Sequence, residues 1–309
     1  MPFDASRSIG WAVKKNNGKI GLAGTRLLHG LCSFWRCAAR TIHDRMKPKY
    51  TYMTTSVGAL PHRRREQAMI GARTSAERIK KTGTWFSCHS HDGTAAFHCT
   101  SQTRIVDEYR ERLERIDANI LARRAESLIC SYPVAGGEYL DLLAHQEVFM
   151  GDSTAIKDFM YDYEKHLKQW RTDNFVNMKS MVAQSPVRDT ITDGSLFVFV
   201  DDILEIIVHE DQRVAAIREQ LRDALATLST KMANGEYGLN DTKNEAIFCV
   251  PSSVISRALS VTKGIGKVLP DCKHLGAQFS PIGAEGPQIR LRVAAARAGF
   301  WRLGQFWTA

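Results

Sequence analysis

The decisive stretch of the sequence is LFVFVDDILEIIV, which runs from Leu196 to Val208. One β-rich run precedes the adjacent carboxylates Asp201 and Asp202, and another follows them. Because valine, isoleucine and phenylalanine favour strands, the pattern predicts a β-hairpin with two acids at its bend. Two neighbouring carboxylates raise each other's pKa unless a cation neutralises them. The stretch therefore predicts a cation site at the bend of a hairpin.

The chemistry of such a site follows from its ligands. Carboxylate oxygens suit Mg²⁺ (or Mn²⁺), which completes its shell with water and substrate phosphates. Two such ions serve nucleotidyl transfer when a further acid comes from a neighbouring strand. Asp92, in the stretch His91-Asp92-Gly93, is the candidate, although an aspartate before glycine is often only a turn residue. Asp92, Asp201 and Asp202 are therefore the candidate acids for such a site.

Helical periodicity is clear in two other regions. Apolar residues at steps of three and four predict one amphipathic helix over residues 103–128 and another over 211–232, which ends at Asn234-Gly235. Further helices are expected after the turn at 58–66, up to residue 170 and over 288–307, with strands over 246–250 and 275–279. The first twenty residues are expected to be a loose polar lead-in. This irregular alternation predicts an α+β fold rather than a doubly wound parallel sheet.

Composition narrows the class of partner. The chain has 309 residues, 44% of them hydrophobic, which is enough for a sizeable core. Lysine and arginine outnumber aspartate and glutamate by 42 to 33, so the formal charge is +9 and an anionic partner, nucleic acid first, is favoured. Seven irregularly spaced cysteines indicate a reducing compartment, so an intracellular location, cytoplasm or nucleus, is expected. No membrane partner is expected, because acids interrupt the strongest apolar run.

Five short motifs follow one another along the chain. They are Asp-x-x-x-Ala-Phe at 92–97, Gly151-Asp152-Ser153, Phe199-Val200-Asp201-Asp202, Leu239-Asn240-x-x-Lys243-x-Glu245 and His274-Leu275-Gly276. Their order resembles that in reverse transcriptases of non-LTR (LINE-like) retrotransposons, and it is more specific than any one motif. Residues 58–67 resemble the fingers motif of this family, and 289–307 the helix after the palm. The resemblance implies a right-hand polymerase fold with an antiparallel palm sheet backed by helices, with fingers and a partial thumb.

The resemblance also implies that Asp92, Asp201 and Asp202 are the catalytic acids and the metal ligands. It further implies roles at the nucleotide. Phe97 would be the steric gate against a ribose 2′-hydroxyl, and Ala96 beside it would leave room for the incoming nucleotide. Gly151 would help to position that nucleotide, and Lys243 would lie near the leaving pyrophosphate. Arginines at the start of the fingers helix, Arg63, Arg64 and Arg65, would contact the phosphates. The turn His274-Leu275-Gly276 would grip the primer.

The expected activity is RNA-directed DNA synthesis, in which a primer 3′-hydroxyl attacks a deoxynucleotide. RNA template, DNA primer and dNTP would be the partners, and the sequence leaves the oligomeric state open. By role, residues 1–20 would be the lead-in, 21–285 the fingers and palm, and 286–309 a basic helix that starts a thumb. The chain departs from the family at Met150, where glutamine is common, and at Asp152-Ser153-Thr154, which replaces a small or proline-containing run. These departures bear on the positioning of template or nucleotide. The sequence also shows no endonuclease upstream, no RNase H downstream and little room for a full thumb, so a fragment or a decayed copy of a larger element is expected.

Several alternatives remain open. A catalytically inactive or truncated polymerase-like protein that only binds nucleic acid is the main rival, and a group II intron-type enzyme is another. A zinc site could use the crowded ligands Cys88, His89, His91, His98 and Cys99, although their spacing matches no familiar finger. His91-Asp92 could also belong to a metal phosphohydrolase. Aromatic residues near the C-terminus could stack on bases, but at helical spacing they are more often core.

Overall fold

The computed structural model describes residues 7–14, 25–46, 52–53, 55–58, 60, 62–94, 96–143, 148, 152–173, 181–184, 187, 191–240, 242–275, 277–280 and 286–302. The chain divides into two compact units, each built from separate segments. The first unit comprises Met1–Met53, Thr94–Trp170 and Thr230–Gly238, and the second comprises Thr54–Gly93, Arg171–Ser229 and Leu239–Ala309. The division by role into 1–20, 21–285 and 286–309 stays a prediction.

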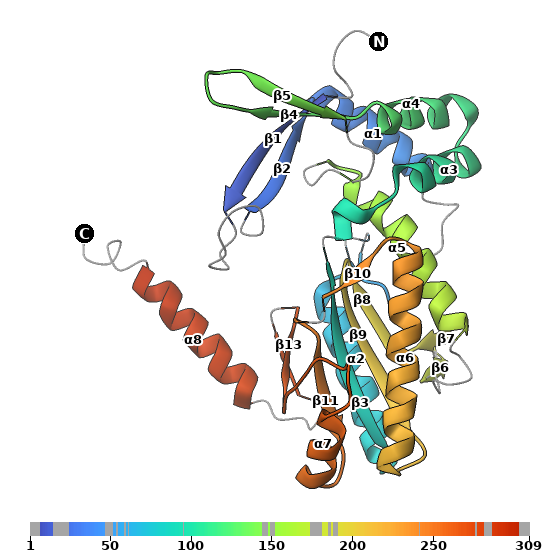
Figure 1. The fold of residues 1–309 in the computed structure, drawn as a ribbon, viewed down its shortest axis with the longest axis vertical. Coiled ribbons are helices and arrows are strands. Elements are labelled where there is room, and N and C mark those ends of the chain that lie inside the picture. Colours follow the sequence, from blue (N-terminus) through green and yellow to red (C-terminus); the bar gives the residue numbers. More distant parts are fainter. Residues whose placement is uncertain are drawn as a thin grey trace. The chain divides into compact units, whose positions relative to one another are not determined.

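The second unit is built around a mainly antiparallel sheet (Figure 1). Its strand order is β12-β11-β3-β9-β8, and β10 also pairs with β3. The strands are β3 (Trp85–Thr94), β8 (Leu196–Phe199), β9 (Asp202–His209), β10 (Gly238–Leu239), β11 (Glu245–Cys249) and β12 (Lys267–Val268). Pairs β3–β9, β8–β9 and β3–β11 are antiparallel, whereas β11–β12 is parallel. The hairpin expected at 196–208 is confirmed.

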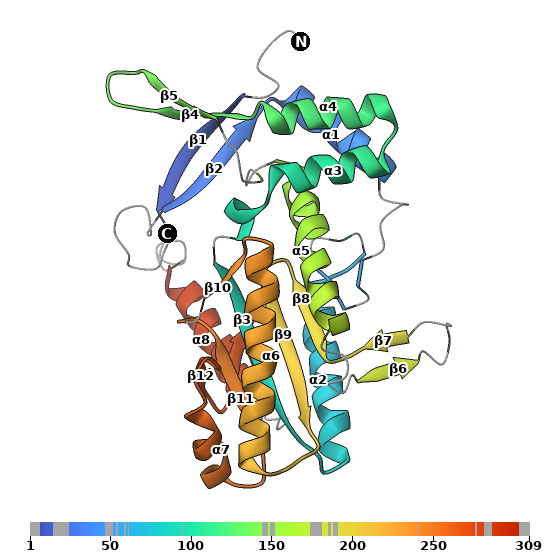
Figure 2. The same cartoon turned by 45° about the vertical axis from the view of Figure 1, so that its right-hand side comes forward.

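Two helices cover the opposite faces of this sheet (Figure 2). They are α2 (Arg65–Lys81) and α6 (Val214–Asn234). Because side chains alternate along a strand, Cys88 and Ile206 join the apolar core with the alanines of α2. His209 points to the other face, where its Nδ1 lies 2.7 Å from Oε1 of Gln220 on α6. The alternation thus gives the sheet one apolar face and one face that contains buried histidine.

Smaller elements complete the second unit. They are α7 (Ser253–Ser260), the antiparallel pairs β6 (Val182–Gln184) with β7 (Ile191–Asp193) and β13 (Cys272–His274) with β14 (Ala277–Phe279), and α8 (Gly286–Arg302). The basic helix expected over 288–307 is confirmed up to Arg302, and the remaining residues lie outside the described ranges. No helix in the described ranges is long and apolar enough to cross a membrane.

The first unit combines a four-stranded sheet with helices. The sheet has the order β2-β1-β4-β5, formed by β1 (Arg7–Lys14), β2 (Thr25–Leu31), β4 (Ile129–Pro133) and β5 (Tyr139–Leu143). The helices are α1 (Ser33–Met46), the 3₁₀ turn η3 (Ala96–Cys99), α3 (Gln102–Arg112), α4 (Arg115–Glu126) and α5 (Ala155–Asp173). A core that includes Trp35, Ile105, Leu121 and Tyr161 joins α1, α3, α4 and α5.

Two predictions about this unit are wrong. The single helix expected over 103–128 is two helices, because Leu113 and Glu114 have extended backbone between α3 and α4. Ile116 is consequently 76% exposed although its spacing placed it on the apolar stripe. The expected loose lead-in contains β1, which pairs along its length with β2 from Ser8↔Leu31 to Lys14↔Thr25. Periodicity within one segment cannot reveal a strand partner supplied by another.

Candidate functional site

Three carboxylates gather at one end of the sheet in the second unit. Asp92 of β3 is the register partner of Asp202, the first residue of β9. Asp202 is also the partner of Phe199, the last residue of β8, so Asp201 occupies the turn of the hairpin. The structure therefore brings together the three acids that the sequence singled out, although they come from strands more than a hundred residues apart along the chain.

The turn that carries the acids is strained. Val200, the first turn residue, has a φ of +61°, which is rare for a β-branched side chain. Tight two-residue hairpin turns require a positive φ at that position and normally use glycine or asparagine there. Gly58 packs against the turn so closely that a side chain at that position would meet the Val200 backbone nitrogen. Strain held in place by surrounding structure is typical of functional sites.

Burial and neighbouring negative charge both disfavour the ionised form of Asp202. Burial raises the pKa of its carboxyl to about 6, and the charges of Asp201 and Asp92 contribute to the rise, while Lys243 opposes it. Burial is the largest cause of this shift, and repulsion from the two neighbouring acids adds to it. An added cation would lower the free energy of this arrangement.

The segment after β10 holds Asp92. Lys243 Nζ lies 2.6 Å from Oδ2 of Asp92, and Asn240 Nδ2 donates to the same oxygen over 3.4 Å. The Asn240 backbone nitrogen also donates to the Asp92 carbonyl over 2.8 Å, and the Asp92 nitrogen donates to Asn244 Oδ1 over 3.4 Å. Lys243 was expected near the leaving pyrophosphate, whereas no role was predicted for either asparagine. The two asparagines follow Asp92 by 148 and 152 residues along the chain, so periodicity within one segment could not reveal these contacts.

The acids are not arranged as a finished metal site. Within the described residues, no three His, Cys, Asp or Glu side chains converge closely enough to ligate an ion. Their donor set nevertheless fits a hard divalent cation in kind, because it is made of carboxylate oxygens and Asp202 is short of compensating charge. Binding requires the three carboxylates to draw together and Lys243 to release Asp92.

Two of the three expected phosphate-binding arginines are open to solvent. Arg64 and Arg65 are exposed at the start of α2. Arg63 is half-buried, and its Nη1 donates to the Ser56 carbonyl. Ser56 in turn pairs with Val198 of β8, the strand that leads to the acids. All three arginines thus belong to the same unit as the acids, and their contact with phosphates stays a prediction.

The proposed gate lies in the first unit. Phe97 is half-buried in η3, where its ring stacks on Phe159 of α5 with centroids 4.8 Å apart. Ala96 is 4% exposed, and its carbonyl accepts a hydrogen bond from the Thr100 hydroxyl over 3.4 Å. The glycine Gly151, expected to position the nucleotide, lies outside the described residues.

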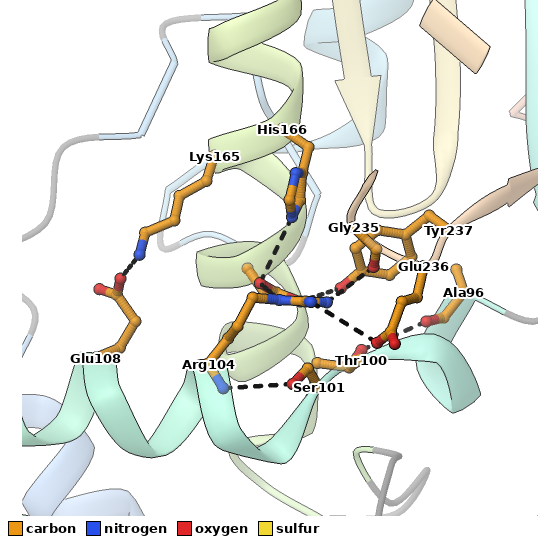
Figure 3. Close-up of polar contacts among 11 residues, drawn as sticks. Ala96, Thr100, Ser101, Arg104, Glu108, Lys165, His166, Gly235, Glu236 and Tyr237 are labelled. Atoms are coloured by element: carbon orange, nitrogen blue, oxygen red, sulfur yellow. Dashed lines mark hydrogen bonds and ion pairs between the residues drawn. The ribbon is translucent and has the colours of Figure 1, made fainter. Parts of the chain in front are cut away.

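A network of polar side chains links α3, α5 and the segment after α6 in the first unit (Figure 3). Arg104 of α3 forms a two-pronged ion pair with Asp162 of α5, with Nε–Oδ1 at 2.7 Å and Nη2–Oδ2 at 3.0 Å. Tyr237 donates to Asp162 Oδ2 over 2.6 Å. Burial raises the pKa of Asp162, but contacts from His166, Arg104 and Tyr237 outweigh it and lower the pKa below its ordinary value. Sequence periodicity could not identify this network, because its members come from three separate segments.

The expected primer grip is described only in part. His274 is 2% exposed, and burial lowers its pKa to about 4. Its Nδ1 lies 3.5 Å from the Ser90 hydroxyl of β3, which places it beneath the sheet rather than on an open surface. Gly276 lies outside the described residues, so the shape of this turn stays a prediction.

The alternative zinc cluster gains no support from the geometry. Cys88 belongs to the apolar core, whereas His89 points to the opposite face, where its Nε2 lies 2.8 Å from the Ser87 hydroxyl. His91 Nε2 lies 3.3 Å from Oε2 of Glu205, and both side chains are buried. The alternation along β3 therefore separates the ligands that crowd together in the sequence.

The chain has the fold of solved telomerase structures. Apo telomerase from Candida tropicalis, truncated from its C-terminal domain, matches with a TM-score of 0.59 at 11% identity, covering 89% of this chain and 53% of that one. Telomerase from Candida albicans in complex with a TWJ fragment of telomeric RNA matches with a TM-score of 0.58 at 11% identity, covering 90% of this chain and 46% of that one. No protein-family model matches the chain, and no curated protein does.

These matches show the fold alone, because the identities are so low. The chain spans about half the length of the telomerases it matches. Its fold is reverse-transcriptase-like, mixed α/β with antiparallel sheets and helices. The expected polymerase fold is confirmed at this coarse level, and the assignment to a non-LTR retrotransposon remains a hypothesis.

Proposed function

We propose that the chain is the catalytic part of an RNA-directed DNA polymerase from a retroelement, which transfers a nucleotide from dNTP to a primer 3′-hydroxyl. The observation that carries the proposal is the register pairing of Asp92 with Asp202, beside Asp201 in the hairpin turn. The three carboxylates, which come from two strands and the turn before one of them, repel one another unless a cation lies between them. Such an arrangement is typical of a functional site that binds cations. The reverse-transcriptase-like fold supports the same reading.

Asp92, Asp201 and Asp202 would hold the divalent cations, Mg²⁺ or Mn²⁺. Such ions, when bound, activate the primer hydroxyl and stabilise the charge of the leaving pyrophosphate. The chain's own part is to hold the three carboxylates at one end of the sheet, so that binding would require the side chains to draw together and Lys243 to release Asp92, but no change of strand register. The Val200 turn fixes Asp201 relative to Asp202, and the hydrogen bonds from Asn240 fix the backbone and side chain of Asp92.

In the transfer step, the primer 3′-oxygen forms a bond to the α-phosphorus, and the bond to pyrophosphate breaks. Lys243 can then neutralise or protonate the leaving pyrophosphate, because its side chain is 61% exposed and its ammonium pairs with Asp92 beside the other acids. Phe97 would exclude a ribose 2′-hydroxyl. Base pairing with the template, rather than a protein side chain, would select the nucleotide.

An RNA template and a DNA primer are the proposed partners. The formal charge of +9 favours binding through phosphates, which weakens as salt rises. Arg64 and Arg65 offer exposed guanidinium groups at the start of α2 for the nucleotide phosphates. One of the matching telomerase structures contains a fragment of telomeric RNA, and we extend only the general class of partner to this chain.

One observation favours a second function, nucleic-acid binding without catalysis. Lys243 contacts Asp92, and no three potential ligands in the described part of the chain converge on one point. A polymerase-like protein that has lost catalysis could keep this ion pair permanently. Such a protein would bind nucleic acid in a salt-sensitive way and would need no divalent cation.

Primer extension on an RNA template with Mg²⁺ and dNTP tests the proposal. The parent chain should extend the primer, and Asp92→Ala and Asp201→Ala should each abolish extension. Asp211→Ala is the matched control, because Asp211 is an exposed acid just beyond β9 in the same unit. Extension that survives in Asp92→Ala would rule out the acid cluster as the catalytic centre. A parent chain that binds template in low salt but never extends it would establish the second function instead.

A further inference from the structure

The ring of Phe97 rests on a stack of buried aromatic side chains in the first unit. Phe159 is fully buried beneath it, with the two ring planes inclined by only 22°. Phe159 stacks in turn on Tyr163 with centroids 4.7 Å apart, and Tyr237 meets it edge-on at 6.0 Å. Phe97 is therefore the outermost ring of a packed column.

Hydrogen bonds and an ion pair hold Tyr237, the ring that meets Phe159 edge-on; Figure 3 shows Arg104, Gly235 and Tyr237 in this network. The Tyr237 hydroxyl donates to Asp162, and Arg104 holds both oxygens of the same carboxylate. Arg104 also donates from Nη2 to the Gly235 carbonyl over 2.8 Å. One guanidinium thus ties α3, α5 and the loop after α6 together, and the Tyr237 side chain cannot move away from Phe159 without losing its hydrogen bond to Asp162.

The backbone at Phe97 is held independently of its ring. The Val148 nitrogen donates to the Phe97 carbonyl over 3.0 Å, and Thr100 donates to the Ala96 carbonyl. With the backbone fixed, the direction of the Phe97 ring depends on what lies beneath it. A flat, fully buried ring favours one stacked orientation over the alternatives.

We propose that Phe159 is a positioning residue for sugar selection, and that the Arg104–Asp162–Tyr237 clamp holds it in place. This inference rests on the proposed function, in which Phe97 excludes the ribose 2′-hydroxyl. A steric filter discriminates only if moving it costs free energy, because otherwise the wrong substrate displaces it. Phe159 supplies that resistance from beneath, without itself contacting the nucleotide.

The test compares the preference for dNTP over rNTP in primer extension. Phe159→Leu keeps an apolar side chain but removes the flat stacking surface, and should lower the preference by about tenfold. Phe97→Ala should lower it further, and the double variant should equal Phe97→Ala alone, because Phe159 acts through Phe97. The matched control is Tyr161→Leu, which removes a buried ring from the same helix that stacks on His43 instead. It should lower the melting temperature but leave the preference unchanged.

A second readout separates this inference from the proposed function. Protein that carries 4-fluorophenylalanine at position 97 should give one narrow ¹⁹F resonance, and Phe159→Leu should split or average it while Tyr161→Leu does not. If the parent chain extends primers and Phe159→Leu keeps the full preference, this inference alone is overturned. If the parent chain never extends a primer, the proposed function fails, and an unaltered ¹⁹F spectrum in Phe159→Leu would then also exclude the positioning role.

Discussion

The two units shift the pKa of a buried carboxyl group in opposite directions. In the first unit Asp162 is almost fully buried, yet its contacts with Arg104 and Tyr237 leave its pKa below the ordinary value. In the second unit Asp202 is only partly buried, and burial together with two neighbouring acids raises its pKa to about 6. A carboxylate whose charge is satisfied stabilises the fold, whereas one left unsatisfied indicates a partner that the chain itself does not supply.

The largest expected effect comes from removing the unsatisfied charge. Asp202→Asn should reduce primer extension by about a thousandfold, because a neutral amide is a poor ligand and cannot balance cationic charge in the transition state. The same change should stabilise the fold by roughly 1 kcal/mol, since it removes repulsion from Asp201 and Asp92 at a partly solvated site. Extension assays and urea unfolding measure the two effects. Loss of activity together with loss of stability would mean that Asp202 is structural.

Acidification should lower the stability of the second unit, because its buried histidines are neutral in the folded state. Burial lowers the pKa of His209 and His274 to about 4, so the unfolded chain, with values near 6.5, takes up protons first as pH falls. Their stabilising contribution is complete above about pH 6.5 and is lost towards pH 4. The groups that face them, Gln220 and Ser87 at His209 and Ser90 at His274, carry no charge to offset protonation.

Asp202 acts in the other direction over the same range of pH. Because its pKa is raised in the folded state, Asp202 takes up a proton between about pH 6 and 4 and the repulsion in the folded state falls. This protonation offsets part of the free energy of unfolding that the histidines lose. His209, His274 and Asp202 together leave a net loss of unfolding free energy on the order of 3 kcal/mol from pH 7 to pH 4, and His89, whose pKa burial also lowers, adds to the loss. Urea unfolding at several pH values between these limits measures it. A stability that stays level, or rises on acidification, would contradict the assignment of neutral buried histidines.

Local pattern was enough to predict the hairpin and its acids. The β-rich runs around Asp201 and Asp202 predict strands. The two adjacent carboxylates repel each other, so they predict a bound cation without any information on the rest of the fold. The motif order added Asp92 and Lys243, which the structure places in contact. Packing between segments that no motif connects escaped prediction. Neither the stack of Phe97 on Phe159 nor the break between α3 and α4 has a signal in the sequence near it.

Removing the satisfied carboxylate should affect the fold instead of the chemistry. Asp162→Asn breaks the pair with Arg104 and weakens the Tyr237 hydrogen bond, which should cost about 2 kcal/mol because Arg104 remains 30% exposed and partly solvated. Asp211→Asn is the control, since its partner Arg213 is open to solvent, and it should leave the urea midpoint unchanged. Equal midpoints for the two variants would show that the clamp contributes nothing to stability.

Divalent cations should stabilise only the unit that contains the acids. Mg²⁺ at about five times its dissociation constant adds roughly 1 kcal/mol, which raises the melting temperature by about 2–4 °C for a chain of this size. Asp202→Asn should abolish the shift, and Asp162→Asn should keep it. Calorimetry at constant ionic strength, with K⁺ in place of Mg²⁺ as the blank, measures both. A shift of the same size in Asp202→Asn would place the cation elsewhere.

The smallest expected effect concerns Lys243, which occupies the oxygen that a cation would need. Because its side chain is 61% exposed, Lys243→Gln should change folding stability by no more than about 0.5 kcal/mol. The same variant should bind Mg²⁺ about threefold more tightly, since the ion no longer displaces an ammonium from Asp92. Titration of the melting temperature with Mg²⁺ compares the half-saturation of the two proteins. Weaker binding in Lys243→Gln would mean that the ammonium orients Asp92 for the ion, so that the two cations cooperate at this carboxylate instead of competing for it.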